Sequence, residues 1–261
     1  MSNSTFKLEE MDIKLDTEYI GTNFIFYDEL NSTNEKLLTD NSIKQHGTVL
    51  LTENQFVGRG RMGRKWISEK DLSLTFSILL TENVDAKNIN IVNLGASLAV
   101  AKSLENLYQL DVNLKWPNDV LISNRKVAGI LVESITKGDR FEKVVVGIGI
   151  NVNQPAFEGK LLIPPTSVRK EFGKPVKRER VLSEVLNEFE STFNQIKTDP
   201  QRVLDSWRSR CNWIGEKVKV INGSDETVGL FDDIDSDGFL LLQQKDGIKK
   251  IVNGDVTLRK T

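Results

Sequence analysis

The sequence predicts an α+β fold, in which helices flank a mixed β-sheet, followed by a small β-barrel at the C-terminal end. Three observations support this prediction. Residues 88–110 and 179–197 repeat apolar residues at a spacing of three to four, which is typical of amphipathic helices. Residues 112–150 contain successive apolar runs joined by connections too short to hold helices. After residue 213 the chain changes to short β-type runs separated by glycines.

The elements before this change are expected in a definite order. Ser32 and Glu35 have the spacing of a capping box, which predicts a helix start. Pro200 suits the first turn of a further helix that reaches Trp207, because proline has no N–H to leave unpaired there. The predicted strands, of which those after residue 112 are expected to be antiparallel neighbours, cover residues 24–28, 48–52, 72–80, 112–116, 120–123, 127–135 and 143–150.

Glycines divide the C-terminal region into short segments. Asp-Gly pairs at residues 237–238 and 246–247 are typical of the turns of β-hairpins. Because short strands joined in this way often form a small barrel, we expect two domains. The boundary lies near Asn212, so the domains cover residues 1–212 and 213–261.

The composition is that of a folded chain with almost balanced charge. The 35 Lys and Arg against 37 Asp and Glu argue against a surface coated for nucleic acid, so any site for a polyanion must be local. The apolar runs are much shorter than the roughly 18 residues that a membrane span needs. The first residues do not resemble a signal peptide. One cysteine, Cys211, excludes an intramolecular disulfide, and a cytoplasmic location without membrane contact is expected.

The segment Gly58-Arg-Gly-Arg-Met-Gly-Arg-Lys-Trp66 combines glycines with cations. The cations are Arg59, Arg61, Arg64 and Lys65. The glycine spacing matches a dinucleotide-binding fingerprint, but that fingerprint opens a helix, whereas residues 72–80 are predicted as a strand. Four like charges on a flexible loop favour ordering by an anion, and arginine forks suit the oxygens of a triphosphate. Taken alone, the segment also fits a solvated basic loop or a patch that contacts DNA.

Lys115-Trp-Pro-Asn-Asp119 lies where a strand ends and proline favours a turn. A lysine at a rigid strand end can contact a carboxylate and the α-phosphate of ATP together, which stabilises charge as an acyl-adenylate forms. Asn118 and Asp119 carry hard oxygen ligands that suit Mg²⁺. The alternative for this segment alone is a capped turn with a surface lysine.

Two later strands contain glycines in their interior. Gly129 lies within Lys126-Val-Ala-Gly-Ile-Leu-Val-Glu133, and Gly147-Ile-Gly-Ile-Asn151 contains two more. Glycine inside a strand often marks the close approach of a ligand or of another backbone. A bulge in a packed strand is the alternative.

Together, these four segments resemble the biotin protein ligase family in content and order. The resemblance spans nearly the whole chain and includes Ser32-Thr-Asn34 before the first helix and Gln55 ahead of the glycine-rich segment. It implies a catalytic domain of the class II synthetase-like fold of biotin and lipoate ligases. It also implies an SH3-like β-barrel at the C-terminal end, which agrees with the strands expected after residue 213. The near-terminal arginine of the family would be Arg259.

The resemblance also implies a set of site residues. Biotin would be bound by Ser32, Thr33, Asn34, Gln55, Gly58, Arg59, Gly60, Arg61, Lys115, Gly129, Gly147 and Gly149. ATP would be bound by Arg59, Arg61, Arg64, Trp66, Asn118, Lys126 and Asn151. Lys115, which would contact the biotin carboxylate, and Arg61 would be the catalytic cations, and Trp66 would pack on the adenine. No fixed metal is implied, but Mg²⁺ would arrive with ATP near Asn118 and Asp119.

The implied reaction is ATP-dependent and AMP-forming. Biotin would become biotinyl-5'-AMP, and a lysine of a biotin carboxyl carrier domain of a carboxylase would then take the biotinyl group. A homodimer is expected by analogy with the family. Some members carry an N-terminal DNA-binding domain, but only about two dozen residues precede the first predicted strand, so no DNA binding is expected.

Two other functions are alternatives to a biotin protein ligase. A lipoate or octanoate ligase or transferase shares the fold, but we expect it to show a motif histidine or a reactive cysteine. Cys211 lies outside every motif, and His46, the only histidine, is expected to cap or pack locally. A non-catalytic module that binds nucleotide or nucleic acid would use the arginines, and its binding would depend strongly on salt. It would leave Lys115 and the strand glycines without a role.

Overall fold

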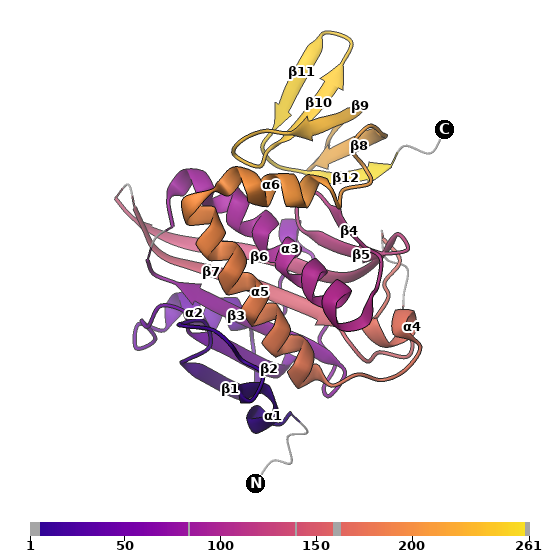
Figure 1. Cartoon of the computed structure of the whole chain (residues 1–261). Coiled ribbons are helices and arrows are strands. Elements are labelled where there is room, and N and C mark those ends of the chain that lie inside the picture. The colour runs from indigo at the N-terminus through magenta and orange to yellow at the C-terminus, as the bar shows by residue number, and fades with distance from the viewer. Residues whose placement is uncertain (1–5, 83, 139, 159–162, 259–261) are drawn as a thin grey trace.

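The computed structural model describes residues 6–82, 84–138, 140–158 and 163–258. A seven-stranded sheet forms its centre, with the strand order β1-β2-β3-β7-β6-β5-β4 (Figure 1). β1 and β2 are parallel and the other neighbours are antiparallel, so the predicted mixed sheet is confirmed. The strands are β1 (Phe24–Leu30), β2 (Val49–Gln55), β3 (Ser73–Leu80), β4 (Val112–Lys115), β5 (Asp119–Ile122), β6 (Arg125–Lys137) and β7 (Arg140–Asn151).

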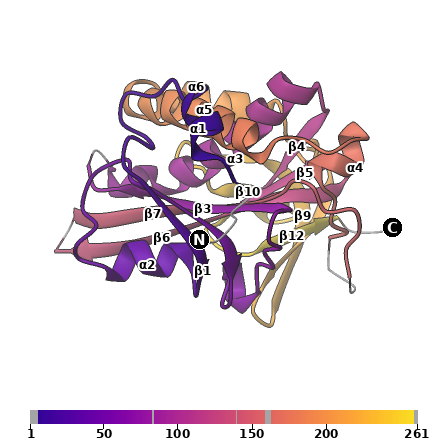
Figure 2. The same ribbon diagram turned by 90° about the horizontal axis from the view of Figure 1, so that it is seen from below.

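Helices lie on both faces of this sheet (Figure 2). The long helices α3 (Ile89–Tyr108) and α5 (Arg178–Thr198) pack together over one face, and α6 (Pro200–Arg208) continues that layer towards the C-terminal strands. α2 (Thr33–Thr39) covers the other face. The predicted helices at 88–110, at 179–197 and from Pro200 are therefore confirmed. The remaining short elements are α1 (Leu8–Asp12), α4 (Val168–Phe172) and the 3-10 turns η1 (Arg61–Gly63) and η2 (Ala86–Asn88).

The two sides of β3 face different surroundings. Its even-numbered residues are apolar and buried in the main core beneath α3 and α5. Ser73, Thr75 and Ser77 alternate with them and therefore face the opposite side of the sheet. There, Ser77 Oγ lies 2.6 Å from polar atoms of both Thr33 and Asn34 of α2. The polar side of β3 thus forms part of the surface beneath α2.

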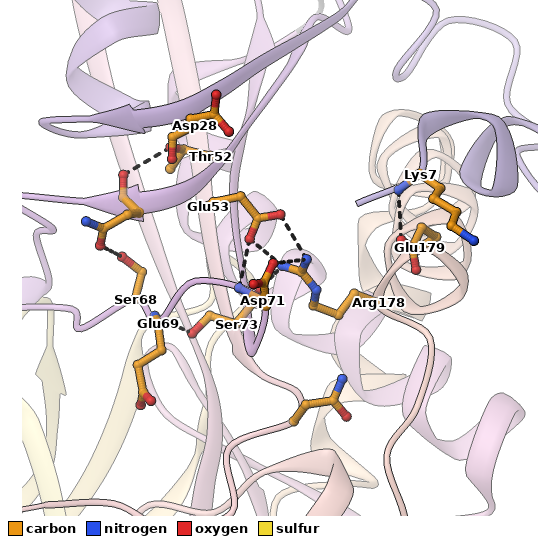
Figure 3. A network of polar contacts seen from close by, with 12 residues as sticks. Lys7, Asp28, Thr52, Glu53, Ser68, Glu69, Asp71, Ser73, Arg178 and Glu179 are labelled. Carbon is orange, nitrogen blue, oxygen red and sulfur yellow. Dashed lines mark hydrogen bonds and ion pairs between the residues drawn. The ribbon is translucent and has the colours of Figure 1, made fainter. Parts of the chain in front are cut away.

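A buried ion pair joins β2 to the start of α5 (Figure 3). Arg178 donates to the two carboxylate oxygens of Glu53 at 2.7 and 2.8 Å, and both side chains are almost completely buried. Glu53 also accepts from the backbone N–H of Asp71 at 3.0 Å, and Arg178 donates to the carbonyl of Ser73. Charge-assisted bonds of this kind are strong, so they fix the segment that leads into β3.

The C-terminal strands form a separate antiparallel sheet with the order β11-β10-β9-β8-β12. The predicted Asp-Gly turns at residues 237–238 and 246–247 join β9 to β10 and β10 to β11. Within the described residues this sheet is not a closed barrel, because β12 pairs with β8 and has no hydrogen-bonded partner in β11. The strands are β8 (Lys217–Asn222), β9 (Asp225–Ile234), β10 (Leu240–Gln244), β11 (Gly247–Ile251) and β12 (Asp255–Leu258).

Among the described residues, no helix is both long enough and apolar enough to cross a bilayer.

Candidate active site

A cavity of about 720 Å³ lies on the side of the central sheet that carries α2. Its wall combines the start of α2, the arginine-rich segment between β2 and β3, and the glycine-containing strands β6 and β7. The predicted ligand residues that line it are Ser32, Thr33, Asn34, Gln55, Arg59, Gly60, Arg61, Arg64, Trp66, Asn118, Lys126, Gly129, Gly147, Gly149 and Asn151. Gly58 and Lys115 do not line it, and Arg259 lies outside the described residues.

The floor of the cavity is a row of residues that crosses the sheet. Thr75 of β3 pairs with Gly149 of β7. Gly149 pairs with Gly129 of β6, which in turn pairs with Asp119 of β5. A Cβ atom on Gly149 would overlap the indole of Trp66. The glycine therefore lets the indole lie directly on the strands, which accounts for a glycine inside a strand at this position.

The start of α2 brings polar side chains to the cavity wall. Ser32 is the N-cap, and its Oγ accepts from the backbone N–H of Glu35 at 3.4 Å, so its own O–H is free to donate to a ligand. Asn34 has no such freedom. Its Nδ2 donates to the carbonyl of Leu131 and to Glu133 Oε2, at 3.1 and 2.8 Å, and its Oδ1 lies within hydrogen-bond distance of β3. Asn34 thus joins α2 to the sheet and holds the wall in place.

Gln55, at the end of β2, presents its amide to the same wall. Its Oε1 accepts from the backbone N–H of Thr33 at 2.7 Å. This bond orients the amide so that Nε2 is on the other side, and no described residue accepts from it. This end of the cavity therefore offers neutral donors from Ser32 and Gln55.

Residues 58–66 form a short hairpin, which we call the arginine hairpin. The backbone N–H of Trp66 donates to the carbonyl of Gly58 at 3.0 Å, and that of Gly60 to the carbonyl of Arg64 at 2.7 Å. Met62 at the tip has a φ of 54°, the left-handed conformation that glycine adopts most easily. The hairpin contains one 3-10 turn and continues into β3, so it does not open the helix that a dinucleotide fingerprint requires.

The cations of the hairpin are partly neutralised, which the sequence alone did not predict. Arg59 Nη2 lies 3.1 Å from Glu35 Oε1 of α2. Burial lowers the pKa of Arg61 below its ordinary value of 12.5, yet the group remains charged at neutral pH. Its buried Nε has no hydrogen-bond partner among the described residues. An enclosed cation with an unused donor favours the binding of an anion.

Asn253 and Asp255, at the start of β12, hold the hairpin from the side of the C-terminal sheet. Arg64 Nη2 lies 2.7 Å from Asp255 Oδ2, and Arg61 Nη2 donates to Asn253 Oδ1. Neither Asp255 nor Asn253 lines the cavity. The C-terminal sheet therefore acts on the cavity through the two arginines.

Asp119 connects two lysines at the other end of the floor. Its carboxylate lies 3.2 Å from Lys115 Nζ and 2.5 Å from Lys126 Nζ. Burial alone would raise the pKa of Asp119, but Lys126 and Lys115 outweigh it and lower the pKa to about 2. Lys115 is itself buried, with Nζ 5.4 Å from the centre of the Trp213 ring. Since one carboxylate faces two ammonium groups, the cluster presents a net positive charge.

The same contacts limit what this end can offer to a metal ion. Both oxygens of Asp119 face lysines, and Asn118 donates its Nδ2 to the carbonyl of Ile130 at 2.6 Å. Among the described residues, no group of three or more His, Cys, Asp or Glu side chains is placed to hold a metal. The Asn118 oxygen remains as a protein ligand, so Mg²⁺ at this position would depend chiefly on the phosphates of a nucleotide.

The structure also brings in residues that the sequence interpretation missed. Thr75 lines the cavity, and Ser77 contacts α2 beside it. The polar residues at every second position of residues 73–77 were the available signal, since one face of a strand repeats with a period of two. Trp213 and Asp255 reach the site through tertiary packing alone, and no local pattern marks them.

Comparison with known proteins identifies the family to which this chain belongs. Residues 27–151 match the biotin/lipoate A/B protein ligase family, and residues 213–259 match the biotin protein ligase C-terminal domain. The bifunctional ligase/repressor BirA of Bacillus subtilis (strain 168) is 33% identical over 261 residues, which cover 97% of this chain and 79% of that protein. The chain belongs to the biotin protein ligase family.

Further members of the biotin protein ligase family agree with this assignment. The biotin--[acetyl-CoA-carboxylase] ligase of Paracoccus denitrificans is 32% identical over 213 residues, or 79% of this chain and 88% of that protein. The solved structure of the Aquifex aeolicus biotin protein ligase in complex with biotin and ATP matches with a TM-score of 0.81 and 33% identity. That match covers 92% of this chain and 100% of the Aquifex chain. The match at residues 213–259 favours a biotin ligase over a lipoate ligase or a binding module.

Proposed function

We propose that this chain activates biotin with Mg-ATP and transfers the biotinyl group to a lysine of a biotin carboxyl carrier domain. One observation carries the proposal: a single cavity has neutral donors at one end, cations at the other, and glycines between them. Neutral donors suit the ureido ring of biotin, while cations suit its carboxylate and the phosphates of ATP. Biotin and ATP are the ligands named for the Aquifex relative, which supports this choice.

The biotin ring is assigned to the end formed by Ser32, Thr33 and Gln55. The Ser32 hydroxyl and Gln55 Nε2 are the donors that the fold leaves unused there. Asn34 has its amide committed to α2 and the sheet, so its contribution is to fix the wall. The other predicted biotin residues form the hairpin and the strand walls: Gly58, Arg59, Gly60, Arg61, Gly129, Gly147 and Gly149.

The nucleotide is assigned to the side of Trp66 and Lys126. Trp66 offers an aromatic face above the floor glycines, which suits the adenine. The predicted arginines of the hairpin, Arg59, Arg61 and Arg64, suit the phosphates because they provide bidentate donors. Asn118 and Asn151 complete the predicted nucleotide side. Mg²⁺ accompanies ATP as part of the substrate.

The reaction needs no protein nucleophile. A biotin carboxylate oxygen attacks the α-phosphorus of ATP, and pyrophosphate leaves with the electron pair of the broken P–O bond. The neutral amine of the carrier lysine then attacks the biotinyl carbonyl, AMP leaves, and the amine gives up a proton. Lys126, Arg61 and the charge of Lys115 stabilise the negative charge on the phosphate. Direct contact of Lys115 with the biotin carboxylate stays a prediction, since Lys115 contacts Asp119 and does not line the cavity.

The predicted domain division, oligomeric state and cellular location belong to the same proposal. Residues 1–212 form the catalytic domain and residues 213–261 the C-terminal domain, which includes Arg259 in the sequence. A homodimer and a cytoplasmic location also belong to the proposal.

The deciding experiment is intact-mass spectrometry of an apo carboxyl carrier domain incubated with this chain, Mg-ATP and either biotin or lipoate. We expect one biotinyl addition, which disappears when the target lysine is replaced by arginine. A lipoyl addition would assign the chain to the lipoate branch. The absence of either addition, with strongly salt-dependent nucleic-acid binding, would favour the binding module.

A further inference from the structure

The cavity floor contains a buried hydroxyl that the steps above do not use. Thr75 is only 3% exposed and lines the cavity, yet its Oγ1 has no hydrogen-bond partner among the described residues. The polar residues on either side of it along β3 do have partners. Ser73 Oγ accepts from Gln154 Nε2 at 2.8 Å, and Ser77 bonds to α2. Because buried polar groups are nearly always paired, the exception requires an explanation.

A second unpaired group lies beside the same glycine. Thr75 neighbours Gly149 across the sheet, and the indole of Trp66 lies directly over Gly149. The buried Nε1 of Trp66 also has no partner among the described residues. An indole N–H can only donate, whereas a threonine hydroxyl can donate or accept. Two buried polar groups without a partner therefore lie beside Gly149 in the cavity wall, and both of them can donate.

We propose that Thr75 is a ligand-binding residue, whose hydroxyl, together with the N–H of Trp66, binds a neutral acceptor atom of the bound reactants. Neither group is charged, and the cations Arg61 and Lys126 already serve the carboxylate and the phosphates. The partner is therefore an uncharged oxygen or nitrogen. This inference rests on the proposed function, whose reactants offer two sources of such an atom: the ureido carbonyl of biotin, and the ribose or adenine of the nucleotide.

Thr75→Val tests the proposal because valine keeps the shape of threonine and removes the hydroxyl. Calorimetric titrations of the intact chain with biotin alone and with Mg-ATP alone distinguish the two sources. We expect affinity for one of the two ligands to fall about five- to twentyfold, the effect of one or two neutral hydrogen bonds. Thr75→Ser keeps the hydroxyl and should stay within about twofold of the unaltered chain. Thr75→Ala also removes the hydroxyl but adds no methyl group that could disturb the packing of β3. It should therefore show the same loss of affinity.

The melting temperature of the ligand-free protein distinguishes a ligand-binding role of Thr75 from a purely structural one. The loss of a structural contact would lower this temperature. Thr75→Val removes an unsatisfied hydroxyl, so the melting temperature without ligand should stay constant or rise while affinity falls. Thr192 supplies a matched control, since its Oγ1 is equally buried and unpartnered but lies in α5, away from the cavity. Thr192→Val should leave both affinities unchanged.

The outcomes separate this inference from the proposed function. Loss of biotin affinity assigns the contact to the ureido group, and loss of ATP affinity assigns it to the nucleoside. Unchanged affinity for both ligands, or an equal loss in Thr192→Val, overturns the role of Thr75. If the unaltered chain forms biotinyl-AMP by mass spectrometry, such a result rejects this inference alone. If it binds neither ligand, both proposals fail.

Discussion

Arg64 and Asp255 form an ion pair of 2.7 Å although they are 191 positions apart in the chain. Arg64 belongs to the arginine hairpin, and Asp255 is the first residue of β12. Because Asn253 binds Arg61 in the same region, the hairpin over the cavity is tied to the C-terminal sheet at two points. Changes in that sheet should therefore alter the cavity without touching a ligand.

Asp255→Asn removes one of these ties. The pair is partly exposed, with 44% of the Arg64 side chain accessible, so the fold should lose less than about 1 kcal/mol. A loss of the same size in the stability of the closed hairpin would make the release of biotinyl-AMP about two- to fivefold faster. Stopped-flow dissociation can measure this rate. Glu226→Gln is the control, since it breaks the exposed ion pair with Lys219 in the same sheet, and neither partner is paired with an arginine of the hairpin. Equal release rates in all three proteins would show that the tie has no effect on the hairpin.

Lys115→Gln tests the charge behind the cavity. Asp119 would keep Lys126 as a partner, so the fold should persist while the cluster loses its net positive charge. By analogy with single transition-state donors, adenylate formation should slow by about 30- to 1000-fold. Single-turnover kinetics with labelled ATP measure this step directly. Lys102→Gln, which removes a lysine paired with Glu188 on the helical face, should react at the normal rate. A similar rate in Lys115→Gln would rule out a catalytic role.

The site could be predicted from the sequence where one segment carries both the chemistry and the backbone constraint. Gly149 is an example, because a glycine inside a strand indicates close approach whatever the approaching group is. The structure supplies the identity of that group, the indole of Trp66, which no spacing rule gives. The long helices were predictable for a similar reason, since their apolar period is local.

Other features depend on contacts that no local pattern encodes. The sequence predicts that Lys115 contacts the ligand, and this stays a prediction. The packing of Lys115 against Asp119 and Trp213 was not predictable, because the position of Trp213 depends on the C-terminal region. The open C-terminal sheet is a second example. Its turns were predictable from Asp-Gly pairs, but no local pattern indicates that Asn253 and Asp255, at the start of β12, contact Arg61 and Arg64.

Glu53→Gln should strongly destabilise the fold. Glu53 and Arg178 are almost completely buried, and the substitution removes the carboxylate that lies closest to the guanidinium, since the Asp71 carboxylate is 3.6 Å away. Breaking a buried pair in this way costs about 3 kcal/mol or more, which chemical denaturation can detect. Replacing both partners, as in Glu53→Leu with Arg178→Met, should recover part of the loss because no buried charge remains. A loss below about 1 kcal/mol for Glu53→Gln would mean that the pair behaves like a surface contact.

His46 should make stability depend on pH. Its Nδ1 accepts from the backbone N–H groups of Thr81 and Glu82 at 3.1 and 3.3 Å, and its ring stacks on Tyr19. Burial, with a smaller effect of Lys197, lowers the pKa of His46 below its ordinary 6.5. The unfolded chain therefore binds the proton more readily, so this contribution is complete above about pH 6.5 and declines as the pH falls.

The measurement is the free energy of unfolding at about pH 7 and about pH 5.5, before most carboxylates titrate. His46→Asn retains a side-chain acceptor for the two N–H groups but has no proton to gain in this range. We expect the variant to be less stable than the unaltered chain at neutral pH, since the stacking is lost, but to show a smaller decrease between the two pH values. Parallel decreases in both proteins would place the pH dependence in other groups.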